Sequence, residues 1–251
     1  MLFNARSLLA SCFATIVPAF APVLLGMTLM LNTFQAIAQP IVEIETNLGT
    51  IEITLHPEAA PGHVENFLNY VNDSDYSNSF FHRSVPGFII QAGGFAYSNQ
   101  QFSYVPADPA VPNEFNLSNI RGTVAMAKLG NDPDSATNQW FINLADNAAN
   151  LDNQNGGFTV FGTVTSGMAV ADAIADLDII NSGGVFNSLP IRNTSLLSNP
   201  VVWDDHLVLI TQATELVNVP MLPSLFSILL AALATCLAMR KNRPLTKAKH
   251  R

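Results

Sequence analysis

The sequence predicts a mainly β fold, an antiparallel barrel capped by two α-helices and flanked by hydrophobic terminal segments. Short segments of strand composition dominate residues 39–218, whereas only two stripes have helical spacing, one early and one late. Both ends of the 251-residue chain are apolar runs without alternation. Many short strands with few helices are typical of an antiparallel barrel whose ends the helices cover.

The predicted body opens with a β-hairpin. Valine and isoleucine alternate with glutamate over residues 42–45, and isoleucine and leucine alternate with Glu52 and Thr54 over residues 51–55. Asn47-Leu48-Gly49 lies between the two segments and supplies a turn. Alternation of period two with acidic side chains outward indicates two strands that are buried on one face.

Two later segments have the spacing of amphipathic helices. Pro61 suits a first helical turn and precedes the stronger stripe. A second, shorter stripe follows Gly167. The apolar residues that fall at helical spacing are Val64, Phe67, Leu68 and Val71 in the first helix and Val170, Ile174 and Leu177 in the second.

Five further short segments of the body have the composition of strands. The length of the body, residues 39–218, is that of one domain. The predicted strands are Phe88–Gln91, Gly122–Ala127, Gln139–Leu144, Thr159–Thr165 and Leu207–Thr214.

Residues 1–38 have the pattern of a secretory signal peptide. Arg6 is the only charge ahead of the apolar stretch Leu8–Leu31, and Ala36-Ile37-Ala38 offers a cleavage site of small residues. The apolar stretch is longer than in most signal peptides, so an uncleaved anchor is the alternative. Both interpretations predict that the body is exported.

Residues 219–251 combine an apolar span with a basic tail. Pro220–Met239 is long enough to cross a bilayer, and six lysines and arginines follow it. The positive-inside rule keeps such a tail in the cytoplasm. We therefore expect a bacterial protein tethered to the membrane by this segment, with its body on the periplasmic or extracellular face.

The start of this segment, Val219-Pro220-Met221-Leu222-Pro223, with the span and tail, resembles the PEP-CTERM type of bacterial sorting signal. The Pro-Glu-Pro core of that signal is absent, and a plain tail anchor fits equally well. The resemblance implies either processing or permanent anchoring.

Charge and cysteine exclude several functions for the body. It carries four of the 11 basic residues and all 19 acidic ones, which gives it a net charge of −15. Such an acidic body argues against nucleic acid as a partner. Cys12 and Cys236 both lie in the hydrophobic ends, so the body has no thiol chemistry, and the five histidines lack metal-ligand spacing.

Three blocks of the body carry chemistry. Phe81–Phe95 sets Arg83 among aromatic and aliphatic residues and places Gln91 eight residues on. Arginine is seldom left among apolar groups without a pairing group, and here a ligand could be that group. The other blocks are Gly122–Asn143 and Leu151–Val164. Together the three blocks resemble the cyclophilins, the barrel-type peptidyl-prolyl cis-trans isomerases.

The resemblance implies an eight-stranded antiparallel cyclophilin barrel with a substrate groove on its outer wall and a packed interior. It implies that Arg83 is the catalytic residue and that Gln91 orients the substrate and helps hold Arg83. Phe161 is expected in the core, and Met126 either in the pocket or in the core. The other residues that the resemblance implies for substrate binding are Phe88, Ile89, Phe141 and Leu151 in the proline pocket, Phe158 on one wall, the backbone of Ala127 and Lys128, and Gln139 beside the flanking peptide.

Rotation about an X–Pro amide makes and breaks no bond, so the expected activity needs no nucleophile, metal or cofactor. The uncatalysed barrier is about 20 kcal/mol. Twisting makes the prolyl nitrogen pyramidal and basic, and a guanidinium aimed at it favours the twisted amide over both planar isomers. A rate gain of about 10⁵ requires only about 7 kcal/mol.

Several positions depart from the cyclophilin pattern. Ala92 stands where a glycine is usual, and Trp140 replaces a phenylalanine. Asn150 stands where many members carry a tryptophan that contacts cyclosporin, so sensitivity to that drug is doubtful. Phe158 replaces a histidine, which we expect to shift the preference for the residue before proline.

We expect an exported isomerase that acts on proline-containing peptides and unfolded exported proteins, as a monomer. The alternative is a non-catalytic module that binds proline peptides or holds unfolded chains in the same groove. A barrel that binds a small ligand inside is disfavoured by the packed interior. The sequence names no client protein and does not fix the oligomeric state.

Overall fold

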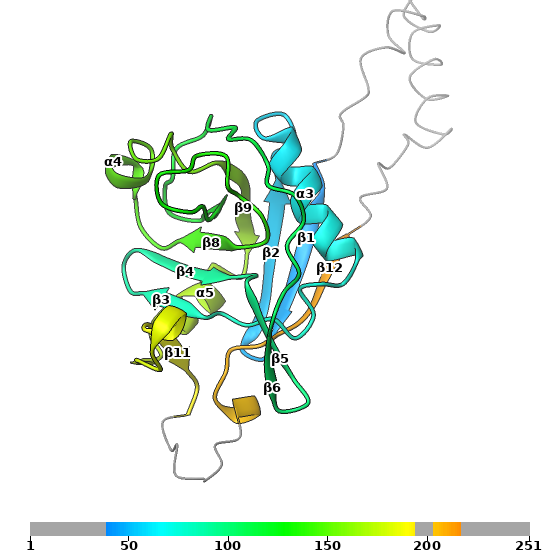
Figure 1. Cartoon of the computed structure of the whole chain (residues 1–251), viewed down its shortest axis with the longest axis vertical. Helices are drawn as coiled ribbons and strands as arrows, with labels where there is room; N and C mark the ends of the chain where they lie inside the picture. Colours follow the sequence, from blue (N-terminus) through cyan, green and yellow to red (C-terminus); the bar gives the residue numbers. More distant parts are fainter. Residues whose placement is uncertain (1–38, 194–202, 217–251) are drawn as a thin grey trace, which may run out of the picture. The chain divides into compact units, whose positions relative to one another are not determined.

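An antiparallel sheet curled into a half-barrel forms the body of the protein (Figure 1), and it consists of eight strands. The structure is a computed structural model, and it describes residues 39–193 and 203–216. The spatial order of the strands is β12-β1-β2-β9-β7-β8-β4-β3. Their bounds are β1 Ile41–Thr46, β2 Gly49–Leu55, β3 Arg83–Val85, β4 Ile89–Ala92, β7 Thr123–Met126, β8 Trp140–Asn143, β9 Val160–Ser166 and β12 Ile210–Leu216.

The two ends of the sheet are joined by the residues that precede its edge strands. The Phe81 N–H donates to the Val208 carbonyl across 3.0 Å, and the Ile210 N–H donates to the Ser79 carbonyl across 2.7 Å. These bonds connect the segment before β3 with the segment before β12. The curled sheet is thereby held around its interior.

Strand alternation fills that interior. The inward residues of the predicted hairpin, from Val42 to Leu55, are fully buried, while Glu43, Glu45 and Glu52 point away from the core. The hairpin prediction is therefore confirmed. The helices α3 (Pro61–Asn72) and α5 (Met168–Ala175) pack onto the same core. Their fully buried contributions include Phe67, Tyr70 and Ile174.

Several small elements were not predicted. The one-turn helix α4 (Ala148–Leu151) adds to the two expected helices, and two 3₁₀ turns occur at Gly184–Phe186 and Trp203–Asp205. Two small sheets lie outside the main one. They pair β5 (Phe95–Ser98) with β6 (Gln101–Tyr104) and β10 (Asp178–Ile180) with β11 (Leu189–Ile191).

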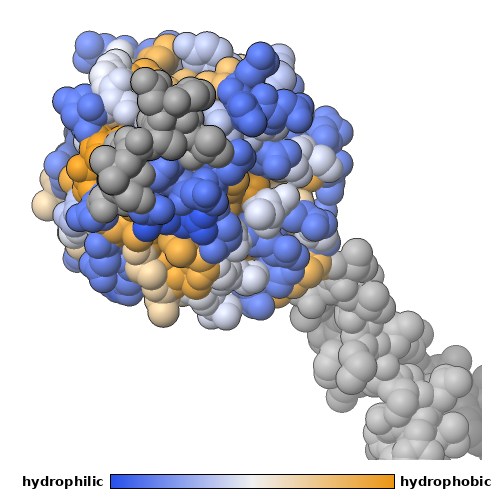
Figure 2. All heavy atoms as spheres, turned by 90° about the horizontal axis from the view of Figure 1, so that it is seen from below, coloured by the Kyte–Doolittle hydropathy of each residue, from blue (hydrophilic) through white to orange (hydrophobic). Residues whose placement is uncertain are grey.

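A second, aromatic cluster packs beneath the β5–β6 hairpin. Phe80 and Phe95 are buried in it, and the partly exposed Phe102 ring lies 5.8 Å from the Phe80 ring. Tyr104 is mostly exposed. Figure 2 views the body from below relative to Figure 1 and shows apolar patches among the hydrophilic residues of that face.

The predictions for residues 1–38 and 219–251, a signal peptide and a membrane or sorting segment, fall outside the described residues. Within the part of the chain that the structure describes, no helix is long and apolar enough to span a membrane.

Candidate active site

A tight turn sets the register of the hairpin that carries Arg83. Pro86 and Gly87 occupy the centre of the turn, Gly87 has φ 72°, and the Phe88 N–H donates to the Val85 carbonyl across 2.9 Å. Proline and then a left-handed glycine at these positions favour a type II turn. The turn fixes β3 against β4 so that Arg83 pairs with Gln91.

Cross-strand pairing then lines up one row of residues over four strands. Arg83 pairs with Gln91, Gln91 with Phe141, and Phe141 with Ala125. Residues directly opposite each other in a sheet share a face. Their neighbours Ile90 and Ile142 belong to the interior core, so this row lies on the outer wall of the half-barrel.

A pocket of ≈ 330 Å³ opens over this row. Its floor is a separate cluster of buried residues that includes Ile89, Phe141 and Leu151. Nine of the eleven site residues implied by the resemblance line it. The complete lining is Arg83, Phe88, Ile89, Gln91, Ala127, Lys128, Phe141, Asn150, Leu151, Gln154 and Phe158.

Arg83 reaches the pocket without a carboxylate partner. Its Nη1 donates to the Gln91 Oε1 across 3.3 Å. None of the ion pairs among residues 39–193 and 203–216 involves Arg83. Burial lowers the pKa of Arg83, and guanidinium stays charged in proteins at neutral pH. The pocket therefore has a partly desolvated cation at one side and an apolar floor.

Gln91 is held on its other side by Gln139. The Gln91 Nε2 donates to the Gln139 Oε1 across 2.9 Å, so the Gln91 amide is oriented with its oxygen toward Arg83. Gln139 lies directly on Gly94, where a Cβ atom would come within 2.7 Å of the Gln139 side chain. The glycine at position 94 thus leaves the space that Gln139 occupies.

Two of the implied residues do not line the pocket. Met126 is fully buried in the interior core, because Ala125 faces outward and the alternation of β7 turns Met126 inward. Its side chain is core, which decides the alternative that the sequence left open. Gln139 is half-buried and acts on the pocket through its bond to Gln91.

Two lining residues, Asn150 and Gln154, were absent from the implied set, although Asn150 had been noted as a departure from the cyclophilin pattern. Their side chains contact each other at the mouth of the pocket. Hydrophobic periodicity and composition give no signal for these two residues, because both lie in or close to α4, and a helix of one turn is too short to show a period.

The second cation of the pocket, Lys128, donates hydrogen bonds to three oxygen atoms and also lies near an aromatic ring. Its Nζ lies 5.0 Å from the centroid of the Phe158 ring, and that ring meets Phe141 edge-on with the centroids 5.8 Å apart. Burial lowers the pKa of Lys128, while the charge of Asp134 raises it. In the described part of the chain, no group of three or more His, Cys, Asp or Glu residues is placed to hold a metal ion.

His82, next to Arg83, is 3% exposed and packs edge-on against Phe95 with centroids 4.8 Å apart. Burial, and then the adjacent Arg83 charge, lowers the pKa of His82 to about 4. The imidazole is therefore neutral at physiological pH and adds no charge beside Arg83. It packs against the second aromatic cluster, to which Phe95 belongs.

Comparison with known proteins agrees with this geometry. The sequence pattern of the family described as "Cyclophilin type peptidyl-prolyl cis-trans isomerase/CLD" matches residues 41–196. A peptidyl-prolyl cis-trans isomerase of Acinetobacter baylyi is 40% identical over 171 residues, which cover 67% of this chain and 89% of the relative. Peptidyl-prolyl cis-trans isomerase A of Dickeya dadantii is 42% identical over 182 residues, covering 71% and 89%.

The fold is also similar to solved structures. A crystal structure of a cyclophilin-type isomerase from Cryptosporidium parvum superposes with a TM-score of 0.53 at 21% identity, covering 72% of this chain and 99% of that one. Because the curated relatives are named isomerases, a module that only binds is not favoured. The chain belongs to the cyclophilin-type peptidyl-prolyl cis-trans isomerase family.

Proposed function

We propose that the pocket on the outer wall binds the prolyl ring of an X–Pro peptide and that Arg83 is the electrostatic catalyst of its rotation. The observation that carries this assignment is a guanidinium without a carboxylate partner among the described residues, beside an open apolar pocket. An unpaired cation at the edge of an apolar pocket is suited to a partner that arrives with the ligand.

Rotation follows from this arrangement in simple steps. The prolyl ring packs on Ile89, Phe141 and Leu151, which immobilises one side of the imide bond. As the amide twists, its nitrogen becomes pyramidal and its lone pair is no longer delocalised into the carbonyl. The lone pair can then accept a hydrogen bond from the Arg83 guanidinium. The interaction is stronger in the twisted state than in either planar isomer, which is the requirement for catalysis.

The required energy is modest. An acceleration of about 10⁵ corresponds to about 7 kcal/mol. Removing one preorganised donor in a partly dry site costs roughly 3–4 kcal/mol in known enzymes. Positioning of the peptide against a rigid wall supplies further stabilisation. Arg83 together with the floor of the pocket is therefore sufficient.

The Arg83 role is tested by measuring isomerisation of an X–Pro peptide with the full chain and with Arg83→Ala. We expect kcat/KM to fall roughly 10²–10³-fold. Arg192→Ala removes a half-buried cation of the same charge, which donates to the Asp204 and Asp205 carbonyls away from the pocket, and serves as the matched control. Peptide binding without acceleration by the parent chain would make it a holding module, and an Arg83→Ala variant with parental kcat/KM would remove Arg83 from catalysis.

The natural substrates in this proposal are unfolded exported chains. Residues 1–38 carry the signal pattern, and residues 219–251 carry an apolar span with a basic tail that resembles a PEP-CTERM sorting segment. The isomerase then works as a monomer on the outer side of a bacterial membrane. The intact mass of the protein recovered from its native membrane tests both termini. A full-length mass in a cytosolic fraction contradicts export.

A further inference from the structure

The Lys128 ammonium lies in a cage of oxygen atoms. Its Nζ donates to the Asn113 Oδ1 across 3.0 Å, to the Asn155 carbonyl across 2.8 Å and to the Gly157 carbonyl across 2.7 Å. An ammonium has three N–H donors, so all of them are used within the protein. The side chain consequently has no donor left for a bound peptide.

Two of the caging oxygens come from an unusual turn. Asn155, Gly156 and Gly157 are consecutive and have φ values of 52°, 76° and 77°. The left-handed conformation costs an ordinary residue about 1–2 kcal/mol and is tolerated by glycine and asparagine. Without outside contacts this turn has little to hold it, because two of its three residues are the most flexible type.

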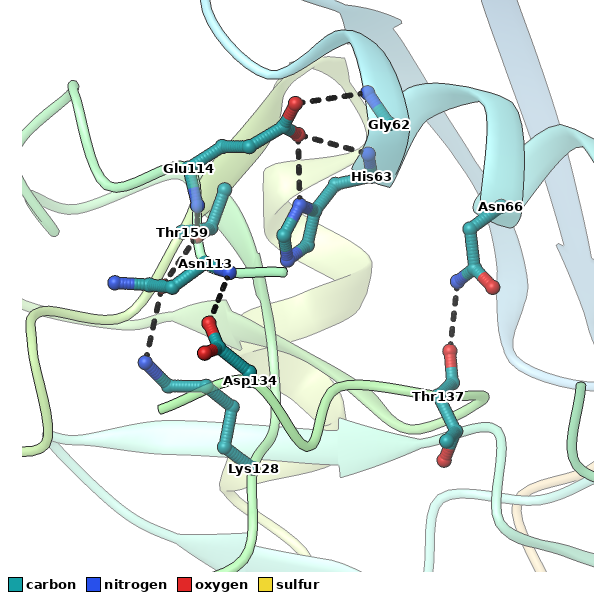
Figure 3. Close-up of polar contacts among 9 residues, drawn as sticks. All are labelled: Gly62, His63, Asn66, Asn113, Glu114, Lys128, Asp134, Thr137 and Thr159. Carbon is teal, nitrogen blue, oxygen red and sulfur yellow. Dashed lines mark hydrogen bonds and ion pairs between the residues drawn. The ribbon is translucent and has the colours of Figure 1, made fainter. Parts of the chain in front are cut away.

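Asn113 completes the restraint of the turn. Its Nδ2 donates to the Gly156 carbonyl across 2.7 Å, so the three successive carbonyls of the turn are held by Lys128 and Asn113 together. Asn113 is fixed in its own right. Its Oδ1 accepts the Thr159 hydroxyl at 2.8 Å, and its N–H donates to the Asp134 carboxylate at 2.8 Å (Figure 3).

The hydrogen-bond network around Asn113 continues to the helix α3. Glu114 donates its N–H to the Thr159 Oγ1 across 3.0 Å, and its carboxylate accepts the N–H groups of Gly62 and His63 at the start of α3 (Figure 3). Lys128 therefore connects the turn to a segment that is tied to the rigid core of the body.

The turn leads directly into Phe158, a wall of the pocket. The Phe158 ring lies over the Lys128 Nζ at 5.0 Å from its centroid, and the Phe158 N–H donates to the Leu151 carbonyl at 3.0 Å. A cation over an aromatic ring attracts it. One ammonium thus restrains the backbone before Phe158 by hydrogen bonds and the Phe158 ring by its charge.

We propose that Lys128 is a positioning residue of the proline pocket, whose caged ammonium fixes the 155–157 turn and thereby the Phe158 wall. This inference rests on the proposed function of the pocket. None of the ion pairs in the described ranges includes Lys128. Its charge is compensated by neutral oxygens, by the Phe158 ring and by the charge of Asp134, so the position of Lys128 depends on the turn. An exposed lysine at this position would instead be solvated and without influence on Phe158.

The test uses Lys128→Ala in the full chain, with isomerisation kinetics and the Kd of an X–Pro peptide as readouts. We expect kcat/KM to fall roughly tenfold, chiefly through KM, because a displaced wall loosens binding of the prolyl ring. n-Propylammonium replaces the deleted atoms from Cγ to Nζ. It should restore part of the peptide affinity to Lys128→Ala and none of the activity of Arg83→Ala.

A double-mutant cycle with Phe158→Ala separates positioning from a general structural role. If Lys128 acts through Phe158, its removal in the Phe158→Ala background changes peptide Kd by less than twofold. Equal losses in both backgrounds, or an unchanged Kd in a folded Lys128→Ala chain, overturn the inference. Lys128→Met keeps the apolar stem and replaces the alanine variant if that variant does not fold.

The two proposals fail in different ways. An inactive parent chain, or an Arg83→Ala variant with full activity, contradicts the proposed catalysis. The positioning role of Lys128 can then still be tested, because it is measured by the Kd of the peptide. An active parent that depends on Arg83 while Lys128 and Phe158 show no coupling contradicts only the positioning role. Arg192→Ala is again the control for the loss of one positive charge.

Discussion

Arg83 and Gln91 face each other across the β3–β4 register, and the Arg83 Nη1 donates to the Gln91 Oε1 across 3.3 Å. The contact is long for a charge-assisted hydrogen bond, which is usually 2.7–2.9 Å. The amide therefore restrains the guanidinium without neutralising it. A neutral partner leaves the positive charge available to a substrate, which a carboxylate at the same position would not.

Two substitutions at Gln91 separate restraint from charge. Gln91→Leu removes the acceptor, and we expect kcat/KM to fall roughly tenfold, less than in Arg83→Ala. A hydrogen bond to a charged group contributes about 1.5–3 kcal/mol, and this long one belongs at the lower end of that range. Gln91→Glu should lose more than Gln91→Leu, since its carboxylate pairs with the guanidinium. The two variants are compared in the peptide isomerisation assay, and Gln91→Glu with the higher activity would contradict this account.

Phe141 and Phe161 offer a comparison between the outer wall and the interior. Phe141 belongs to the floor of the pocket, whereas Phe161 is fully buried in the central core. Phe161→Ala should lower the free energy of unfolding by about 3–5 kcal/mol. Phe141→Ala should raise KM, and the increase should remain after the activity is corrected for the fraction of folded protein. Denaturant titration measures the stability of both variants, and isomerisation kinetics measure their KM. If the activity of each variant falls only as much as its folded fraction, the contrast is refuted.

The stability of the body should depend on pH through His82. Its pKa falls from 6.5 to about 4 in the folded state. Because the folded pKa lies below the unfolded one, the unfolded chain takes up the proton first as pH falls. The free energy of unfolding is therefore highest above pH 6.5, as far as His82 determines it, and it falls between pH 6.5 and about 4. The loss due to His82 amounts to roughly 2 kcal/mol at pH 4.5.

Denaturant unfolding at pH 7 and pH 4.5 measures this loss, and His82→Gln identifies its source. The difference in unfolding free energy between the two pH values should shrink by roughly 2 kcal/mol in His82→Gln. The carboxylates titrate alike in both proteins and cancel in the comparison. An identical pH dependence in parent and variant would assign the effect to other groups.

Glu114 should stabilise the body by capping α3 from a distant loop. Its carboxylate accepts the Gly62 and His63 N–H groups and the His63 Nδ1, at 3.1, 3.0 and 2.8 Å. Burial alone would raise the pKa of Glu114, but the hydrogen bonds from His63 and Gly62 together outweigh burial, so the net shift of the pKa is downward. Glu114→Ala should cost about 1–3 kcal/mol of unfolding free energy, because buried N–H groups lose their acceptor.

Glu58→Ala is the control for the loss of one carboxylate. The Glu58 side chain is 60% exposed and lies 3.5 Å from His56. Exposed pairs of this kind contribute little, so its removal should change stability by less than about 1 kcal/mol. Thermal unfolding of both variants measures the difference, and similar shifts would mean that Glu114 does not act as a cap.

The sequence predicted the elements that bury the side chains of one face and expose those of the other. The hairpin β1–β2 and the helix α3 each bury one face, so their periods are visible in the residues. It missed β6, whose four residues are all exposed, and β3, which has only three residues. In these strands backbone pairing decides the structure, and pairing leaves no period in so short a segment.

The pocket was predicted by resemblance to a family more than by pattern. The resemblance implied nine of its lining residues, but strand parity alone decides that Ala125 faces outward and Met126 inward. The oxygen cage of Lys128 was missed, because it joins Asn113 to residues 155 and 157, which follow it by 42 and 44 positions in the sequence. Contacts of this kind have no local signature.

The pairing of β1 with β12 has a consequence for how the body is made. The strand that begins at Ile41 takes its partner from residues as late as Leu216. During synthesis, the edge of β1 stays unpaired until almost the whole body has emerged, and sheets that depend on such distant partners form slowly. A chain truncated before Ile210 therefore leaves an edge open to aggregation.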